Sequence, residues 1–148
     1  MIVYRICHPD YAHDLSGYGS SINGARWNER GFPVLYTATT SSLTILEFLV
    51  HIRGIKGNIS YKLLTIDMNS MDVIEPSGLN RHWVDDQKPT QRIGTEWLKS
   101  KGSIGLKVPS AHNPLECNIL WNPRHPKFNP QIVRSDYYWY DGRLILQT

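Results

Sequence analysis

Several features that define common protein classes are missing from this sequence of 148 residues. No apolar run approaches the roughly 18–20 residues that span a bilayer, so we expect no transmembrane segment. The amino end has no basic segment followed by an apolar stretch and a small-residue cleavage site, so no secretion signal is expected either. We therefore expect a soluble, cytoplasmic protein without a membrane partner.

Cysteine is scarce, and charge of one sign is not concentrated anywhere. Neither Cys7 nor Cys117 has a Cys or His neighbour at metal-ligand spacing, so we expect reduced thiols and no metal. The net charge is +3, and the 16 Lys and Arg residues are scattered. Direct binding of nucleic acid is therefore not expected, whereas a small anionic substrate would fit this mild basicity.

Three catalytic signatures are also absent. The chain has no Gly-x-Gly-x-x-Gly motif and no phosphate loop that ends in Gly-Lys-Ser/Thr, which argues against a dinucleotide-binding Rossmann domain and a P-loop NTPase. It has no Gly-x-Ser-x-Gly elbow, so Ser110 with a histidine is a poor candidate for a hydrolase triad.

A Gly- and Ser-rich stretch over residues 16–24 has no helical or strand period, and we expect a loop there that approaches a ligand closely.

The remaining pattern predicts one domain over residues 1–148. The expected strands are residues 2–7, 33–38, 59–67, 104–108 and 118–121, the expected helices are residues 42–53 and 90–101, and a hairpin is expected around Asp141-Gly142. Because strands and helices do not strictly alternate, we expect an α+β fold with a mixed, largely antiparallel sheet and flanking helices.

The helix over residues 42–53 contains one unusual residue. Ser41 or Ser42 is expected to cap its start and Gly54 to end it, and its side chains are apolar nearly all the way round, which predicts a central helix. Glu47 is its only acid. A carboxylate there either pairs with a cation (Arg5, Arg26 or Arg53), meets a network of donors, or has a raised pKa, so it is a structural or a catalytic group.

Three further side chains are candidates for a site. Arg26 follows the Gly/Ser stretch and is suited to binding phosphate through two parallel hydrogen bonds, although a surface pair with Glu29 is the simpler reading. Tyr36 lies within an expected strand, where it is either a core residue or a stacking face. Ser110 is a turn residue or cap unless it serves a site. The six histidines lack metal-ligand spacing and are expected to be surface or network groups.

At these positions the sequence resembles the RES-domain family, the toxins of RES–Xre toxin–antitoxin pairs, which are named for an Arg, a Glu and a Ser. The resemblance covers nearly the whole chain in order and is most specific from Gly24 to Glu47. The matching segments are Tyr4-Arg5-Ile6, Gly24-Ala25-Arg26-Trp27-Asn28 with Gly31, Val34-Leu35-Tyr36, Ser42-Leu43 through Leu46-Glu47 with His51, and Val108-Pro109-Ser110-Ala111 with Asn118 and Asn122-Pro123. Ala25 and Thr44 depart from the family's usual Gly and Ala, and both are small.

The resemblance implies an ADP-ribosyltransferase-like fold and an enzyme that consumes NAD as a substrate, without a cofactor. The residues that it implies as catalytic are Arg26, Tyr36, Glu47 and Ser110, and those that it implies as substrate-binding are Arg5, Arg26, Tyr36 and Asn118. It also implies an Xre-type antitoxin as partner, and the five Trp and eight Tyr residues favour toxin dimerisation within that complex.

The acceptor of the ADP-ribose stays open at this point. Water or phosphate would make the chain an NAD glycohydrolase or phosphorylase, and a protein side chain would make it an ADP-ribosyltransferase. A module that binds a nucleotide without turning it over is the non-enzymatic alternative.

Overall fold

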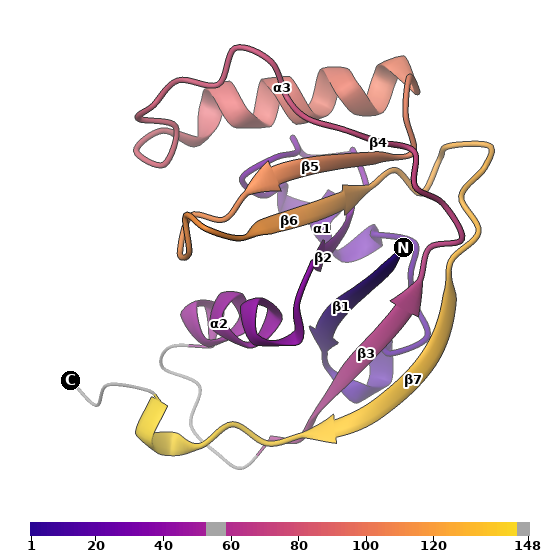
Figure 1. Cartoon of the computed structure of the whole chain (residues 1–148), viewed down its shortest axis with the longest axis vertical. Coiled ribbons are helices and arrows are strands. Elements are labelled where there is room, and N and C mark those ends of the chain that lie inside the picture. Colours follow the sequence, from indigo (N-terminus) through magenta and orange to yellow (C-terminus); the bar gives the residue numbers. More distant parts are fainter. Residues whose placement is uncertain (53–58, 145–148) are drawn as a thin grey trace.

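The computed structural model describes residues 1–52 and 59–144, in which a single sheet carries helices on its surface (Figure 1). Its strands are β1 (Ile2–Cys7), β2 (Leu35–Ala38), β3 (Tyr61–Asp67), β4 (Val73–Ile74), β5 (Gly105–Pro109), β6 (Cys117–Trp121) and β7 (Gln131–Tyr138), and its α-helices are α1 (Tyr18–Asn23), α2 (Ser41–His51) and α3 (Gln87–Ser100). Short 3-10 helices span Pro9–Tyr11 and Gly142–Leu144.

The strands lie in the order β4-β5-β6-β2-β1-β3-β7. Only the β4–β5 pair is parallel in the described part of the chain, and the other neighbours are antiparallel. The expected α+β fold with a mixed, largely antiparallel sheet is therefore confirmed. Because β1 and β2 lie in the middle of the sheet, residues from the start of the chain lie close to residues of β6, which are more than 100 positions later in the sequence.

Successive residues of the strands alternate between two core clusters on opposite faces of the sheet. In β6, Ile119 and Trp121 belong to one cluster, and Leu120 belongs to the other. The second cluster includes Trp97 and Leu98, through which α3 covers the β5–β6 end of the sheet. This alternation is the period of two expected for strands buried on both faces.

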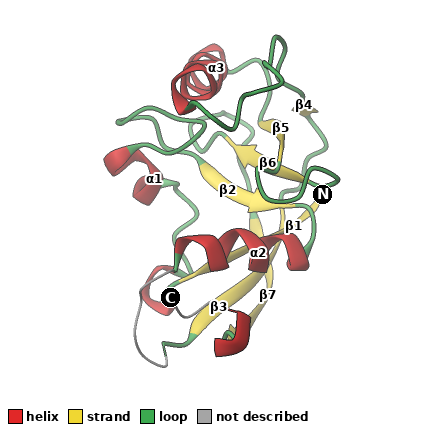
Figure 2. Cartoon of the chain, turned by 90° about the vertical axis from the view of Figure 1, so that its left-hand side faces the viewer, coloured by secondary structure: helices red, strands yellow, loops and turns green. Residues whose placement is uncertain are grey.

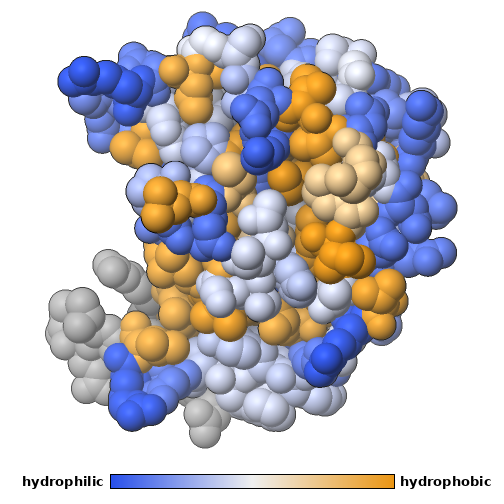
Figure 3. All heavy atoms as spheres, viewed as in Figure 1, coloured by the Kyte–Doolittle hydropathy of each residue, from blue (hydrophilic) through white to orange (hydrophobic). Residues whose placement is uncertain are grey.

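Helix α2 lies across β1 and β2 (Figure 2), and it differs from the prediction in two respects. Thr40, not Ser41 or Ser42, caps it, because the Thr40 hydroxyl accepts a hydrogen bond from the Leu43 amide at 3.1 Å. The helix is not central: Leu46 and Val50 are each 37% exposed, and apolar atoms are visible at its level on the left of the molecule (Figure 3). The helix ends at His51, with Ile52 as its C-cap, and not at residue 53 as predicted. The predicted stop at Gly54 lies outside the described residues.

The stretch over residues 16–24 is not a plain loop, because it contains α1. Gly17 precedes this helix with φ +69°, and a Cβ at Gly17 would lie 2.6 Å from the Val34 carbonyl carbon. The backbone there approaches the neighbouring segment more closely than any side chain allows. The glycine-rich composition thus serves a close contact within the protein, and Gly24 onward reaches the cavity described below.

The other boundary errors have local causes. Helix α3 begins three residues earlier than predicted, because the Asp86 carboxylate accepts from the Lys88 amide and caps it. It ends at Ser100, and Lys101 takes the left-handed conformation that was expected at Gly102. None of the helices in residues 1–52 and 59–144 has the length and apolar character to cross a bilayer.

The predicted hairpin at Asp141-Gly142 is wrong. Its first half is the end of β7, but Gly142–Leu144 is a 3-10 helix rather than a returning strand. The Asp141 carboxylate accepts a hydrogen bond from the Arg143 amide at 2.9 Å, which closes a local turn in place of the hairpin. Ile145 and Leu146 of the predicted second strand lie outside the described residues.

Candidate active site

A cavity of about 710 Å³ opens between α2, the first turn of α3 and the β5–β6 end of the sheet. Of the six residues predicted for the site, Arg5, Arg26, Tyr36, Glu47 and Asn118 line it. They come from β1, the α1–β2 connection, β2, α2 and β6, so the fold joins segments that are more than 100 residues apart along the chain. Ser110 lies directly behind the lining, between Pro109 and Ala111, which belong to it.

The carboxylate of Glu47 lies in a network of donors at this cavity. Its Oε1 accepts from the Ser110 hydroxyl at 2.7 Å and from the Asn118 amide Nδ2 at 2.8 Å. Its Oε2 lies 3.4 Å from Nε2 of His112. Of the alternatives left open for Glu47, the structure therefore shows the network of donors, formed by two neutral groups with an imidazole nearby, and it shows no arginine partner among the described residues.

Ser110 is almost fully buried, with 3% of its surface exposed. Its hydroxyl oxygen accepts from the amides of His112 and Asn113, each at 3.0 Å, while its proton goes to Glu47. All its hydrogen-bonding capacity is used in this arrangement. Ser110 thus orients Glu47, and nothing in its contacts supports a Ser–His nucleophile pair.

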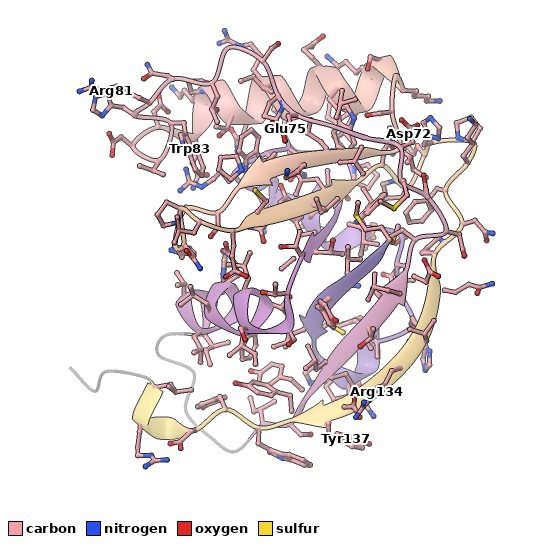
Figure 4. The ribbon with its side chains drawn as sticks, viewed as in Figure 1. Asp72, Glu75, Arg81, Trp83, Arg134 and Tyr137 are labelled. Carbon is pink, nitrogen blue, oxygen red and sulfur yellow. The ribbon has the colours of Figure 1, made fainter. Side chains whose placement is uncertain are left out.

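Arg26 is half-buried and does not pair with Glu29, so the surface-pair reading is wrong. Its Nη1 donates to the Val84 carbonyl at 3.2 Å, and its guanidinium lies 5.4 Å from the centre of the Trp83 ring. Trp83 lies on the connection between β4 and α3 (Figure 4). The Arg26 carbonyl accepts from the Thr90 hydroxyl at 2.6 Å, which ties this residue to α3.

Arg5 supplies a second cation to the same cavity. It projects from β1, and its Nη1 donates to the Asp14 carbonyl at 2.7 Å. Both arginines are thus fixed through backbone carbonyls rather than carboxylates, so neither positive charge is neutralised by these contacts. Two such cations beside one carboxylate form a site with charges suited to a ligand that carries both phosphates and hydroxyl groups.

Tyr36 is fixed through its hydroxyl group. That group donates to Oδ1 of Asn28 at 2.6 Å and accepts from the Trp27 amide at 3.2 Å. The Nδ2 of Asn28 in turn donates to the carbonyls of Ser20 and Phe32. Burial raises the pKa of Tyr36 above its usual range. With the hydroxyl engaged, the ring is the part that Tyr36 presents to the cavity.

Sequence reasoning missed two residues of this site as functional candidates. Asn28 belongs to the segment that resembles the family, but the sequence predicts no role for it. It is fully buried, and its hydrogen bond from Tyr36 anchors the loop that carries Arg26. His112 was assigned to the surface or network histidines, yet it lies at Glu47. The sequence signal for His112 is its position two residues after Ser110. If Ser110 contacts Glu47 at a turn, the residues next to Ser110 lie close to Glu47 as well.

Fold and site together define an α+β protein in which a single oriented carboxylate and two arginines share one cavity. The pattern that defines the RES domain family matches residues 2–141. The chain belongs to the RES domain family, as the resemblance predicted.

Two relatives and one solved structure show how widely the match extends. "Toxin Res" of Yersinia enterocolitica is 40% identical over 151 residues, covering 97% of this chain and 99% of the relative. A "Prs ADP-ribosylating toxin" of a Sphingobium species is 35% identical over 144 residues, covering 90% and 88%. A chain of the M. tuberculosis MbcT–MbcA toxin–antitoxin complex superimposes with a TM-score of 0.78 at 21% identity, covering 93% of this chain and 83% of that chain. This last likeness establishes a shared fold.

Proposed function

We propose that this chain is the toxin of a toxin–antitoxin pair and that it cleaves the nicotinamide–ribose bond of NAD, with water or phosphate as acceptor. The observation that carries the proposal is the oriented Glu47 carboxylate, held on Oε1 by Ser110 and Asn118, at a cavity that two arginines line. Membership of the RES domain family and a relative named "Toxin Res" that matches nearly end to end support it.

One carboxylate suffices for this reaction. The bond between C1′ and the pyridinium nitrogen breaks with its electron pair going to the ring, so nicotinamide leaves as a neutral molecule and needs no general acid. Glycosidases, by contrast, must protonate a leaving oxygen and use two carboxyl groups. Glu47 would bind a ribose hydroxyl and stabilise the positive charge that develops at C1′. The oxygen of water then bonds to C1′ and releases a proton to the solvent, or an ionised oxygen of phosphate bonds to C1′ directly.

The other residues would bind the rest of the substrate. Arg26 and Arg5 would hold the pyrophosphate, and the Tyr36 ring would stack on the nicotinamide or the ribose face. Ser110 and Asn118 would act through Glu47, because both donate to its Oε1. No cofactor or metal is part of this mechanism, and NAD enters only as substrate.

The proposal includes the partners and the compartment. An enzyme that drains NAD harms its own cell, so we propose an antitoxin of the Xre type that keeps the chain inactive, a homodimer of the toxin within that complex, and action on the cytoplasmic NAD pool. The structural neighbour comes from a complex of a toxin with its antitoxin, which supports an antitoxin partner.

Replacing Glu47 tests the proposed activity. In Glu47→Gln, the amide keeps the shape of the side chain but cannot supply negative charge to the ribose, so we expect nicotinamide release to fall by at least about 100-fold. The measurement is nicotinamide release from NAD by the purified, antitoxin-free chain, with and without inorganic phosphate. A requirement for phosphate would identify phosphate as the acceptor.

Glu96→Gln is the matched control. Glu96 is an exposed acid on α3, outside the cavity lining, that pairs with Lys99, so we expect this variant to retain wild-type turnover. Near-wild-type release by folded Glu47→Gln would refute the mechanism. The fold of both variants is verified by circular dichroism and thermal unfolding.

A protein acceptor is the second candidate, and one observation favours it. The Sphingobium relative, which aligns over 90% of this chain, is named for ADP-ribosylation of Prs. If this chain transfers ADP-ribose to a protein, nicotinamide release stays slow with water and phosphate, and label from NAD appears on a protein of a cell lysate. Binding of NAD without release or transfer would indicate a non-catalytic module.

A further inference from the structure

The two carboxylate oxygens of Glu47 have different surroundings, and Oε2 has one polar partner among the described residues. Its Oε1 is occupied by the hydroxyl of Ser110 and the amide of Asn118. The second oxygen, Oε2, lies 3.4 Å from Nε2 of His112, and the two side chains are 23% and 30% exposed. Glu47 and His112 both line the cavity. The oxygen left for a substrate hydroxyl is therefore the one that His112 contacts.

We propose that His112 is a positioning residue that aims Oε2 of Glu47 at the substrate. This inference rests on the proposed function, which makes Glu47 the catalytic carboxylate. The terminal torsion of a glutamate side chain is broad, so fixing only Oε1 leaves the plane of the carboxylate free to turn. The imidazole 3.4 Å from Oε2 limits this turning before the substrate arrives, which is the preorganisation that an electrostatic catalyst needs.

The backbone around His112 supports this role. The amide of His112 donates to the Ser110 hydroxyl at 3.0 Å, and that hydroxyl donates to Oε1 of Glu47. One residue of the β5–β6 turn therefore reaches both oxygens of the same carboxylate, Oε1 through Ser110 and Oε2 through its own ring. The first route is made by the backbone amide and fixes where residue 112 lies, and the second depends on the imidazole itself.

A second connection holds this turn against the helix that carries Glu47. The Thr40 hydroxyl, which caps α2, donates to Oε1 of Glu116 at 2.6 Å. The other oxygen of Glu116 accepts from the Asn113 side chain at 2.7 Å. The β5–β6 connection is thus attached to the start of α2 at Thr40 and to the same helix again at Glu47, about two helical turns further along. These two attachments fix the position of the imidazole relative to the carboxylate.

Two substitutions at His112 separate positioning from mere packing. His112→Ala removes the imidazole contact, and we expect kcat for nicotinamide release to fall about tenfold while KM for NAD stays within about twofold. His112→Gln places an amide N–H near the position of Nε2, and we expect it to restore kcat to within about threefold of the wild type. His13→Ala, at an exposed histidine outside the cavity lining, should match the wild type.

Unchanged kcat in His112→Ala would overturn the proposal. So would a loss of kcat in His112→Gln as large as that in His112→Ala. A positioning contact can be made by another polar side chain, whereas a reaction step that needs the imidazole itself cannot be carried out by an amide.

A measurement that needs no turnover keeps this inference separate from the proposed function. Nitrogen NMR of the imidazoles reports the environment of each ring. We expect the Nε2 resonance of His112 to move in Glu47→Gln and the His13 resonances to stay in place. If the wild type releases no nicotinamide and the His112 resonance moves, the proposed function fails and the positioning contact stands. A His112 resonance that does not respond to Glu47→Gln would refute the contact itself.

Discussion

At the scale of single residues, the Tyr36 hydroxyl has the best-defined energetic role in the site. It is buried, and both of its hydrogen bonds are made within the loop that carries Arg26. Tyr36→Phe removes the hydroxyl and leaves the Trp27 amide and the Asn28 carbonyl oxygen without that partner. Because unsatisfied buried polar groups are costly, we expect a loss of about 1–3 kcal/mol in the free energy of unfolding at pH 7, measured by urea denaturation.

The same hydroxyl makes stability depend on pH in the alkaline range. Burial raises the pKa of Tyr36 in the folded state above its unfolded value of about 10. Its contribution is therefore complete below pH 10 and is lost as the pH rises, because the unfolded chain releases the proton first. The wild type should lose up to about 1.4 kcal/mol per pH unit relative to Tyr36→Phe, so the difference between the two narrows above pH 10.

The other tyrosines are present in both proteins, so their titration cancels in this comparison. The measurement is the urea midpoint of both proteins from pH 7 to pH 11. A difference in stability that stays constant over this range would show that Tyr36 ionises equally in the folded and unfolded chains, contrary to its burial.

The residue types and their order in the sequence predicted which residues form this site, but they did not predict the contacts among them. Arg5, Arg26, Tyr36, Glu47 and Asn118 were predicted to act together, and they line one cavity. Whether Glu47 meets an arginine or a donor network depends on how far β5, β6 and α2 lie from one another, and no local pattern encodes that distance. The sequence signal for His112 was only its place two residues after Ser110, and the path of the β5–β6 turn decides that its ring reaches Glu47.

At the scale of elements, periodic segments were predictable and the connections were not. Strand β1 matches its predicted bounds, because its β-branched residues and the Pro9-Asp10 sequence after it are local signals of a strand and its end. Asp141-Gly142 failed as a hairpin because a turn sequence permits a reversal without requiring one, and the pairing of Asp141 with Arg143 formed a 3-10 helix instead. The composition of residues 16–24 likewise allowed the short helix α1 as well as a loop.

Helix α3 holds the Arg26 loop at a point of close approach. A Cβ at Gly94 would lie 1.8 Å from the Trp27 carbonyl oxygen, so no side chain fits without moving the helix away from the loop. We expect Gly94→Ala to lower the free energy of unfolding by about 2–4 kcal/mol despite the better helix propensity of alanine. It should also weaken NAD turnover, because the residue before Trp27 is Arg26. Thermal unfolding and nicotinamide release measure the two effects.

Gly19 provides the control within another helix. It lies in α1, and nothing is within 4 Å of the position its Cβ would take. Gly19→Ala should therefore be neutral or stabilise the protein by up to about 1 kcal/mol. If Gly94→Ala were as harmless as Gly19→Ala, the close packing of α3 on the Trp27 carbonyl would be wrong.

At the scale of the whole molecule, the cavity lies between two helices that cover different strands of one sheet. Helix α2 packs on β1 and β2, and α3 covers the β5–β6 end. A ligand that contacts Arg5 and Glu47 on one side and Arg26 on the other would bind only the folded chain, in which these residues lie together. Ligand binding and global stability should therefore be coupled by mass action.

Glu47→Gln allows this coupling to be measured, since NAD should bind to it without being consumed. At NAD concentrations near 100 times Kd, binding should stabilise the folded state by about 2.7 kcal/mol. For a chain of this size that corresponds to a rise in Tm of roughly 5–10 °C. Adding Arg26→Lys should reduce the rise to less than about half, because an ammonium group cannot reproduce the paired hydrogen bonds of a guanidinium on phosphate. An equal rise in Tm in both proteins would mean that NAD binds without Arg26. No rise in the Tm of folded Glu47→Gln at millimolar NAD would mean that NAD is not the ligand of this cavity.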